Sequence, residues 1–456
     1  MSLSTDSPGA TRQLADFVVR TNYNDIPQSA RDAARLSLVN FLGVSIGGAR
    51  HEETESALRA LCGLGADGTV TVLGREERLN ALAAAFINGT SSAVLDFDST
   101  QMKRTNIHPS GPVVPAILAF AQGRAVSGKE FIAAYILGVE VACRIANALF
   151  GEVNPGWHVT GVTGGIGAAA AIAKMLGLDA EKTAKAMAIA ANQSSGLREM
   201  YGTGCKALVP GRAARDGLLA AFLAAEGISA PARPIEGRKG LSMVFTGREA
   251  PPSMLEGFGT SYEIEWNIFK PFPCAIVTHP VIDGVSRICA AEDIKPGDIA
   301  ALELEVAPIA IELAGHMVPQ TPLQSKFSLT HTAAVAATHR GAGTEHFSEE
   351  ALHDPGFGGL RRMVTVRAKD GLRKDEAYLL IRDRSGKEYT VYVEHALGSL
   401  ENPMTDNDIA TKFMGLVEPV FGPQKARDIL DYATFLEKNS DAGYIAKISE
   451  DTHTDA

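Results

Sequence analysis

The sequence predicts a mainly α-helical protein, with a large all-helical domain and a smaller α+β domain inserted into it. The chain has 456 residues, 45% of them hydrophobic, which allows a sizeable core and exceeds the length of one ordinary domain. Apolar residues return at helical spacing from about residue 10 to 265, a two-residue alternation follows, and helical spacing resumes near the C-terminus. We therefore predict an all-helical domain over residues 1–266 plus 401–456 and an α+β domain over 267–400.

The helical part is predicted as a series of amphipathic and buried helices. One begins near Asp25 with Pro27 in its first turn, where the missing proline N–H costs nothing. Small-residue stretches such as GAAAAIA allow close approach of helix backbones in a buried interior. The other predicted helices cover residues 79–95, 111–122, 128–150, 164–176, 179–193 and 211–226.

The α+β part begins near Pro271, where apolar and polar residues start to alternate. Leu302, Leu304 and Val306 alternate with acidic or small residues, as in a half-buried strand. Further strands are predicted at residues 363–367, 378–382 and 389–393, the last two joined as a hairpin through the turn 384–386.

Composition excludes several classes of partner. The net charge of -10 and a pI near 5.6 give no attraction to nucleic acid or anionic lipid. Five scattered cysteines without a CxxC pair favour reduced thiols over a disulfide framework or a structural zinc site. The N-terminus lacks a signal-peptide hydrophobic region, and we see no run of the roughly 20 apolar residues that a bilayer span needs. We expect a cytoplasmic protein without nucleic acid or membrane partners.

The densest polar segment runs from Asp96 to His108 and contains DFDST, two cations and HPSG. Asp96 and Asp98 follow an apolar helical run, where the helix dipole opposes negative charge, so a function would explain their placement. Thr100 and Arg104 lie in the same segment. The structural alternative is that Asp96 and Thr100 organise a helix exit and that His108 is a satisfied loop histidine.

A second candidate is His158 in the segment GWHVTG, before a helix predicted to open at Gly164. A helix N-terminus favours neutral imidazole and binds anions with its free amides, which suits a general base beside a carboxylate. The glycines of GVTGGIG resemble a dinucleotide fingerprint, but no strand precedes them, so we reject nicotinamide binding. A glycine-rich turn explains the glycines and leaves His158 unexplained.

Two lysines complete the set of candidates. Lys206 precedes the helix predicted from Gly211, where a cation is unfavourable unless an anionic ligand lies between them. Lys270 lies in KPFPC, at the predicted junction of the two domains, and clefts between domains are preferred ligand sites. The alternatives are a solvated surface lysine and a rigid proline-rich linker. The sequence gives weak support for a metal site, because the eleven histidines are scattered and do not show the spacing of metal ligands.

Taken in order, these segments resemble the MmgE/PrpD family along the whole chain. DFDST with HPSG, then GWHVTG, GCKALVPGRAA and FKPFPC with a following TH are similar to the family's blocks, and GRKGLSMVF and GSLENPM add agreement. The resemblance implies a large helical domain built from both chain ends, a smaller α+β lid domain and a homodimer. It also implies an active site in the cleft without a metal or organic cofactor.

Carried over by motif, the resemblance implies active-site roles for Asp96, Thr100, His108, His158, Lys206 and Lys270. Two positions depart from the family pattern: Ser99 replaces a third aspartate, and Ala275 replaces a histidine found in some decarboxylase members. Loss of that imidazole argues against cis-aconitate decarboxylation, where it would protonate the product carbanion.

Proton removal next to a carboxylate requires a base at the carbon and cations or amide donors at the carboxylate oxygens. Asp96 or His158 is a candidate base, while Lys206 and Lys270 hold the small anionic substrate. Arg104 or Arg212 is a candidate clamp for a second carboxylate. We expect the predicted catalytic and anion-binding residues to converge on one cleft between the two domains, namely Asp96, His108, His158, Lys206 and Lys270.

Three functions remain open at this point. We favour a cofactor-independent epimerase of the iminodisuccinate type. The chain retains the motifs that carry the acid and base residues, but it lacks residues associated with other branches of the MmgE/PrpD family. A 2-methylcitrate dehydratase-like hydro-lyase is the second. A non-catalytic organic-acid binding protein is the third, and it would show thermal stabilisation by ligand without turnover.

Overall fold

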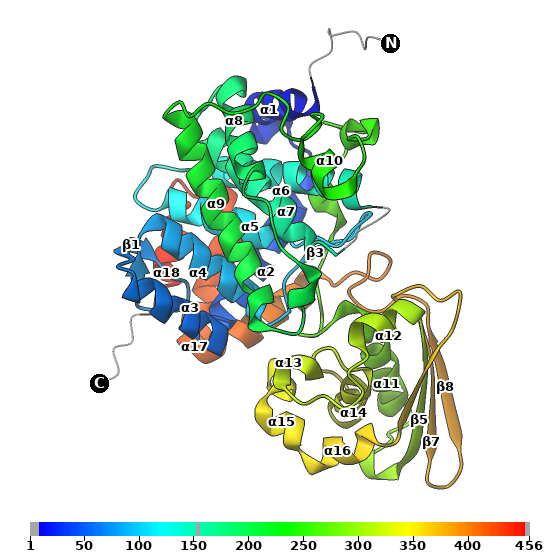
Figure 1. The fold of residues 1–456 in the computed structure, drawn as a ribbon. Helices are drawn as coiled ribbons and strands as arrows, with labels where there is room; N and C mark the ends of the chain where they lie inside the picture. The colour runs from blue at the N-terminus through cyan, green and yellow to red at the C-terminus, as the bar shows by residue number, and fades with distance from the viewer. Residues whose placement is uncertain (1–8, 152–155, 452–456) are drawn as a thin grey trace. The chain divides into compact units, whose positions relative to one another are not determined.

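A computed structural model describes residues 9–151 and 156–451 of the chain (Figure 1). The chain divides into two compact units. Unit 1 comprises residues 1–94, 98–267 and 406–456, and unit 2 comprises residues 95–97 and 268–405. The predicted mainly α class is confirmed, because helices far outnumber strands among the described residues. The short segment 95–97 belongs to unit 2 although its sequence neighbours on both sides belong to unit 1.

The core of unit 1 is formed by helices made largely of small and apolar residues. Helix α7 (Val159–Met175) packs against both α6 (Gly128–Phe150) and α9 (Leu208–Ala225). Glycines permit this approach: a Cβ at Gly167 would lie 2.4 Å from the carbonyl oxygen of Gly138 on α6. By length and composition α6 could cross a membrane, but 94% of its apolar window is buried inside the protein, as in a core helix.

The rest of unit 1 surrounds this core. Helix α2 packs against α17, so segments from the two ends of the chain lie side by side. Helix α17 contains a kink at Gly422 (φ 76°), which precedes a proline. The remaining helices of unit 1 with their bounds are α1 (Ala10–Arg20), α2 (Gln28–Gly47), α3 (Glu52–Gly63), α4 (Ala81–Val94), α5 (Ser110–Ala121), α8 (Ala180–Ala191), α10 (Leu241–Thr246), α17 (Asp406–Thr434) and α18 (Tyr444–Ile448).

Three expectations for unit 1 need correction. It is not all-helical, because β1 (Asp67–Thr71) pairs antiparallel with β2 (Arg78–Leu79), and β3 (Thr100–Gln101) is a further short strand. Helix α7 begins at Val159, five residues before the predicted start at 164, since complete burial of its first turns outweighs the low helix propensity of valine, threonine and glycine. The helix predicted to begin near Asp25 is α2, but it begins at Gln28 with Pro27 as its N-cap rather than in its first turn, and Tyr23–Asp25 form a separate 3-10 turn.

Unit 2 contains a four-stranded mixed sheet in the order β6-β5-β7-β8. Strand β5 (Ile299–Val306) pairs parallel with β6 (Val364–Ala368) and antiparallel with β7 (Ala377–Asp383). Strand β7 pairs antiparallel with β8 (Glu388–Val393), which confirms the predicted hairpin. Gly386 adopts φ 90° in its turn, a conformation that residues with a Cβ rarely adopt.

Helices cover the sheet of unit 2. Helix α11 contacts β7 and β8, and α14 contacts β6, so apolar residues of sheet and helices form one core. The remaining strand, β4 (Asn267–Ile268), lies at the boundary of the units in the sequence. The helices of unit 2 are α11 (His279–Ala291), α12 (Pro308–Ala314), α13 (Pro322–Ser325), α14 (Leu329–His339), α15 (Glu349–His353) and α16 (Pro355–Arg361).

Candidate active site

The segment after α4 carries the first predicted residues. Asp96 lies two residues beyond the end of α4 and adopts a left-handed backbone conformation, with φ 53°. For a residue other than glycine such a conformation costs on the order of 1 kcal/mol or more, so surrounding contacts must hold it. Asp96 belongs to unit 2 and Asp98 to unit 1, so the two aspartates, separated by one residue, are held by different sets of contacts.

In unit 1, His108 is oriented through its Nδ1 atom. Nδ1 lies 3.0 Å from the Asp98 carboxylate, 3.1 Å from the Ser99 carbonyl oxygen and 3.3 Å from the Thr100 hydroxyl. We assign a proton to Nδ1, because the Ser99 carbonyl oxygen can only accept a hydrogen bond. Nε2 is then the ring nitrogen that can exchange a proton with a ligand. The geometry makes His108 a candidate for proton transfer through Nε2.

A buried hydrogen-bond network holds the His108 loop in place. The backbone N–H of His108 donates to the Thr160 hydroxyl at 3.0 Å, which ties the loop to the first turn of α7. The hydroxyl groups of Ser99 and Ser110 lie 3.1 Å apart, and Ser110 bonds to the Tyr135 hydroxyl at 2.7 Å. Complete burial raises the pKa of Tyr135, so its hydroxyl stays protonated. The loop is therefore preorganised without a ligand.

His158 is the N-cap residue of α7 and only 3% of it is exposed. Its buried Nδ1 has no hydrogen-bond partner among the described residues. Burial is the main cause that lowers the pKa of His158 to about 3; His108 and Lys206 act in the same direction, while Asp98 opposes them. The imidazole is thus neutral at neutral pH, in agreement with the expectation from its position at a helix N-terminus.

Lys206 ends a 3-10 turn (Gly204–Lys206) directly before α9 and is half-buried. Its charge contributes to the low pKa of His158, which places the two residues within electrostatic reach of each other. Together with Asp98, Thr100 and His108, these residues form one group, which we call the unit 1 group.

Asp96 and Lys270 form a second group inside unit 2. The ammonium group of Lys270 donates to the Asp96 carbonyl and carboxylate oxygens, both at 2.9 Å, and to the Cys274 carbonyl at 3.3 Å. Lys326, also buried, donates to the Leu95 carbonyl at 2.8 Å. The two lysines therefore account for the left-handed turn at Asp96. Sequence reasoning missed Lys326, because no local pattern distinguishes it from an exposed lysine.

Two predicted arginines stand apart from these contacts. Arg104 is exposed and makes no hydrogen bond or ion pair with another described residue; it lies beside Gly151 at the end of α6. The guanidinium group of Arg212 is occupied by backbone carbonyl oxygens of Gly161, Gln193 and Ser195. The structure therefore gives neither arginine a geometry that identifies it as a clamp for substrate.

The described residues thus divide the predicted site into the unit 1 group and the pair of Asp96 and Lys270 in unit 2. The pair of Asp96 and Lys270 is buried, whereas the unit 1 group combines buried residues with the half-buried His108 and Lys206. Each group joins a carboxylate to a cation or an imidazole. Convergence of both groups on one cleft stays a prediction.

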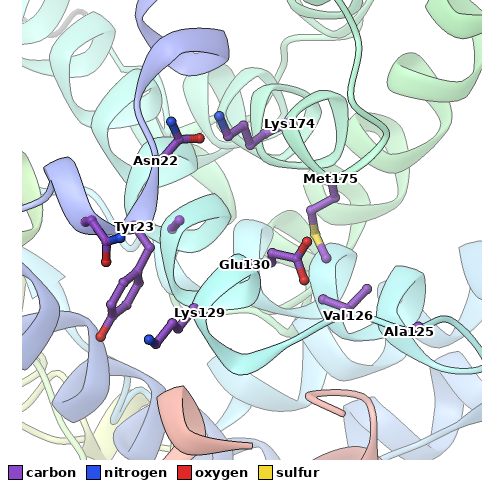
Figure 2. Close-up of a pocket in the computed structure, with 10 residues that line it drawn as sticks. Asn22, Tyr23, Ala125, Val126, Lys129, Glu130, Lys174 and Met175 are labelled. Carbon is purple, nitrogen blue, oxygen red and sulfur yellow. The ribbon is translucent and has the colours of Figure 1, made fainter. Parts of the chain in front are cut away.

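A separate cavity of about 380 Å³ in unit 1 contains none of the predicted site residues (Figure 2). Figure 2 shows Asn22, Lys174, Lys129 and Glu130 among its lining side chains. Lys174 donates to the Val19 carbonyl at 2.8 Å, and Glu130 accepts from the N-terminal turn of α6. Because these lining groups serve the local structure, we assign no chemistry to this cavity.

One group of possible metal ligands occurs among the described residues, in unit 2. Ligand atoms of Asp375, His395 and Glu401 lie within 4.8 Å of one another. The guanidinium group of Arg373 lies 3.4 Å from the Asp375 carboxylate and supplies a positive charge at this cluster. Metal binding is therefore not needed to balance these carboxylates, and the cluster contains no residue of the predicted site.

The family of the chain follows from comparison with known domains. The profile of the MmgE/PrpD N-terminal domain matches residues 12–253, and that of the MmgE/PrpD C-terminal domain matches residues 272–438. The chain belongs to the MmgE/PrpD family. The resemblance in the sequence motifs is thereby confirmed, and the match covers both units of this MmgE/PrpD protein.

Several relatives of this MmgE/PrpD protein are named as cis-aconitate decarboxylases or as similar to them. The cis-aconitate decarboxylase of Aspergillus terreus is 25% identical over 468 residues, covering 96% of this chain and 95% of the relative. A cis-aconitate decarboxylase-like protein, oryM, of Aspergillus oryzae is 25% identical over 470 residues, covering 96% of each chain. The human cis-aconitate decarboxylase is 24% identical over 397 residues, covering 83% of this chain and 81% of the relative.

These names do not support the expected reaction. The relatives are named as cis-aconitate decarboxylases or as decarboxylase-like, so the comparisons give no support to the iminodisuccinate epimerase reading and no better support to the hydro-lyase. The expectation that Ala275 argues against decarboxylation depended on one position, whereas these similarities extend over most of the chain. The comparisons support the more general conclusion that the chain is an enzyme of the MmgE/PrpD family.

The low pKa of His158 predicts an acid-labile fold. Between pH 6.5 and about 3 the unfolded chain binds a proton on His158 that the folded chain excludes, so stability falls as pH falls through this window. The contribution of this group is about 1.4 kcal/mol per pH unit. Thermal midpoints measured at about pH 7, 6 and 5 should fall less steeply in His158→Gln than in the wild type.

His353→Gln provides the control, because the His353 side chain is 70% exposed. This variant should follow the wild-type pH dependence. Equal slopes for the wild type and His158→Gln would show that folding does not lower the pKa of His158.

Proposed function

We propose that this MmgE/PrpD protein is a cofactor-independent lyase that acts on a small tricarboxylic acid, with decarboxylation of cis-aconitate as its reaction. The observation that carries the proposal is His158: a buried, neutral imidazole at a helix N-terminus, whose Nδ1 has no partner among the described residues. Buried polar atoms without a partner are rare, so a bound ligand is the natural partner of this nitrogen.

The chemistry requires a group that supplies a proton. Loss of CO₂ breaks a carbon–carbon bond and leaves its electron pair on carbon, where the neighbouring double bond and carboxylate spread the charge. One proton must then reach carbon to complete the unsaturated dicarboxylate product. His158 and His108 are the proposed proton carriers, since both are imidazoles within electrostatic reach of each other.

The charges of the unit 1 group suit an anionic substrate. Lys206 is the proposed partner of a substrate carboxylate, and the free amides at the start of α7 provide a second anion-binding element. A bound tricarboxylate would raise the pKa of His158 from its low value, because its negative charge favours imidazolium. Substrate binding would thereby prepare the proton donor that the carbanion needs.

Ala275 bears directly on this proposal. Its methyl group cannot carry a proton, and its backbone N–H donates to the Lys326 carbonyl at 3.0 Å. Some decarboxylases have a histidine at this position. Under the proposal, an imidazole of the unit 1 group carries the proton in its place. Asp96, Thr100, Arg104 and Lys270 stay predicted substrate-site residues.

Incubation with cis-aconitate in D₂O tests the function. We expect release of one CO₂ per turnover and incorporation of one deuterium on carbon in the product, both measurable by NMR. 2-Methylcitrate and aminodicarboxylates run in parallel as alternative substrates.

Each alternative outcome overturns the proposal in a different way. Loss of water from 2-methylcitrate without CO₂ release from cis-aconitate would identify a hydro-lyase. Deuterium exchange into an aminodicarboxylate without bond cleavage would identify an epimerase. Thermal stabilisation by the acids without any turnover would identify a binding protein.

A further inference from the structure

A strap formed by residues 193–197 lies against the segment that carries His158. The backbone N–H of His158 donates to the Gly196 carbonyl at 3.0 Å, and Trp157 forms an antiparallel bridge with Leu197. The strap follows α8 and is not part of a regular element. The backbone position of His158 is therefore linked to the position of the strap.

Arg212, on the first turns of α9, ties the strap to α7. Its Nη2 donates to the Ser195 carbonyl at 2.9 Å and to the Gly161 carbonyl at 3.1 Å, and its Nη1 donates to the Gln193 carbonyl at 2.8 Å. One of these acceptors lies on α7, and the other two lie on the strap. Only a planar guanidinium presents several donors in a fixed fork that bridges such acceptors.

The close approach of these segments depends on two glycines. A Cβ at Gly161 would lie 2.3 Å from the Ser195 carbonyl oxygen and 3.2 Å from Nη2 of Arg212. Gly196 adopts φ 129°, which residues with a Cβ rarely adopt, and its Cβ position faces His158 at 3.3 Å. The close contact between the strap and the first turn of α7 therefore explains why both positions are glycine.

The imidazole of His158 has no polar anchor of its own at Nδ1. Its described ring contact is edge-on with Tyr201, at 5.5 Å between centroids and 87° between planes. In many sites a carboxylate or carbonyl fixes the ring through one nitrogen, as Asp98 does for His108. For His158 the orientation must come from its backbone, and thus from the strap.

We propose that Arg212 is a positioning residue for His158: it fixes the imidazole by holding the strap against the first turn of α7. The inference rests on the proposed function for its kinetic consequence, because the role of His158 in turnover is part of that proposal. Arg212 itself is held by Asp216, whose carboxylate lies 3.3 Å from Nη1.

Arg212→Ala and Arg215→Ala form a matched pair of variants. Arg215 lies on the same helix and pairs with the same Asp216 at 2.8 Å, but it makes no hydrogen bond to the strap. In Arg212→Ala we expect kcat for cis-aconitate to fall about 10-fold to 10²-fold, the size of effect that small misplacement of a catalytic group produces. KM should change by less than about threefold, since substrate contacts remain.

Two further measurements separate positioning from general destabilisation. Guanidinium ion at a non-denaturing concentration should restore part of the kcat of Arg212→Ala and leave Arg215→Ala unchanged. The ring ¹⁵N signals of His158, assigned by their loss in His158→Gln, should shift in Arg212→Ala and not in Arg215→Ala. If Arg212→Ala does not fold, Arg212→Lys should show the reduced kcat, because an ammonium group cannot bridge three carbonyl oxygens.

Specific results would overturn the inference. Retention of kcat and of the His158 ring signals in Arg212→Ala or Arg212→Lys would exclude the positioning role. A rise in KM with unchanged kcat would instead make Arg212 a direct substrate contact. If the wild type turns over no tricarboxylate, the proposed function fails by itself, and the His158 ring signals alone decide the role of Arg212.

Discussion

Replacement of His158 by Gln is expected to lower kcat for cis-aconitate by about 10² to 10⁴, the usual cost of losing a proton-transferring group. Gln keeps the size and polarity of the side chain at the start of α7 but cannot carry the proton. Binding of the unreactive propane-1,2,3-tricarboxylate should change by less than about threefold, because the charges that hold the anion remain. Steady-state kinetics and calorimetric binding together provide the measurement.

The exposed His353→Gln variant is the control and should retain wild-type kinetics. Circular dichroism must show that both variants are folded. Near-normal turnover in His158→Gln would transfer the proton-carrying role to His108, whose Nδ1 is held by Asp98. Weak binding with normal turnover would make His158 a substrate-binding residue instead.

Replacement of Lys270 by Met is expected to destabilise unit 2 by about 3 to 5 kcal/mol, the cost of leaving one partner of a buried ion pair without the other. The side chains of Lys270 and Asp96 are 5% and 6% exposed. Without the ammonium group the Asp96 carboxylate stays buried, and Asp96 loses one hydrogen bond at this carboxylate and one at the carbonyl of its left-handed backbone. Hydrogen exchange in the strands of unit 2 measures the loss, since it reports on local as well as global unfolding.

Lys295→Met is the matched control, because Lys295 pairs with Asp293 in an ion pair whose side chains are both more than half exposed. It should leave hydrogen exchange unchanged. The double variant Asp96→Asn/Lys270→Met should recover part of the lost stability, because no charge of the pair remains buried. A single Lys270→Met variant as stable as the wild type would contradict the structural role of the pair.

The candidate site shows where sequence reasoning succeeds. His158 stood out because a histidine beside a predicted helix start is a local pattern, and the structure places it at the N-cap of α7. His108 and Asp98 stood out because they lie within one short segment. In each case the pattern that marks the residue is local, so spacing along the chain brought it to attention.

Local pattern did not reveal interaction partners that are distant in the sequence. Lys270 and Asp96 are 174 residues apart, and Lys326 lies 231 residues from the carbonyl that it contacts. Arg104 or Arg212 was predicted as a candidate clamp for a substrate carboxylate, because an arginine in a conspicuous motif suggests an anion. Its actual acceptors, such as Gly161 and Gln193, are backbone oxygens, which every residue supplies and no motif marks.

The sequence by itself determined the mainly α class, the hairpin of β7 and β8 and the family, because periodicity, turn residues and ordered motifs are properties of neighbouring residues. Only the tertiary structure decided that residues 95–97 belong to unit 2 and that α7 begins at Val159, directly after His158. Both depend on burial and on hydrogen bonds between distant segments. Such contacts form only when the chain packs, and their free energies outweigh the local propensities that a sequence displays.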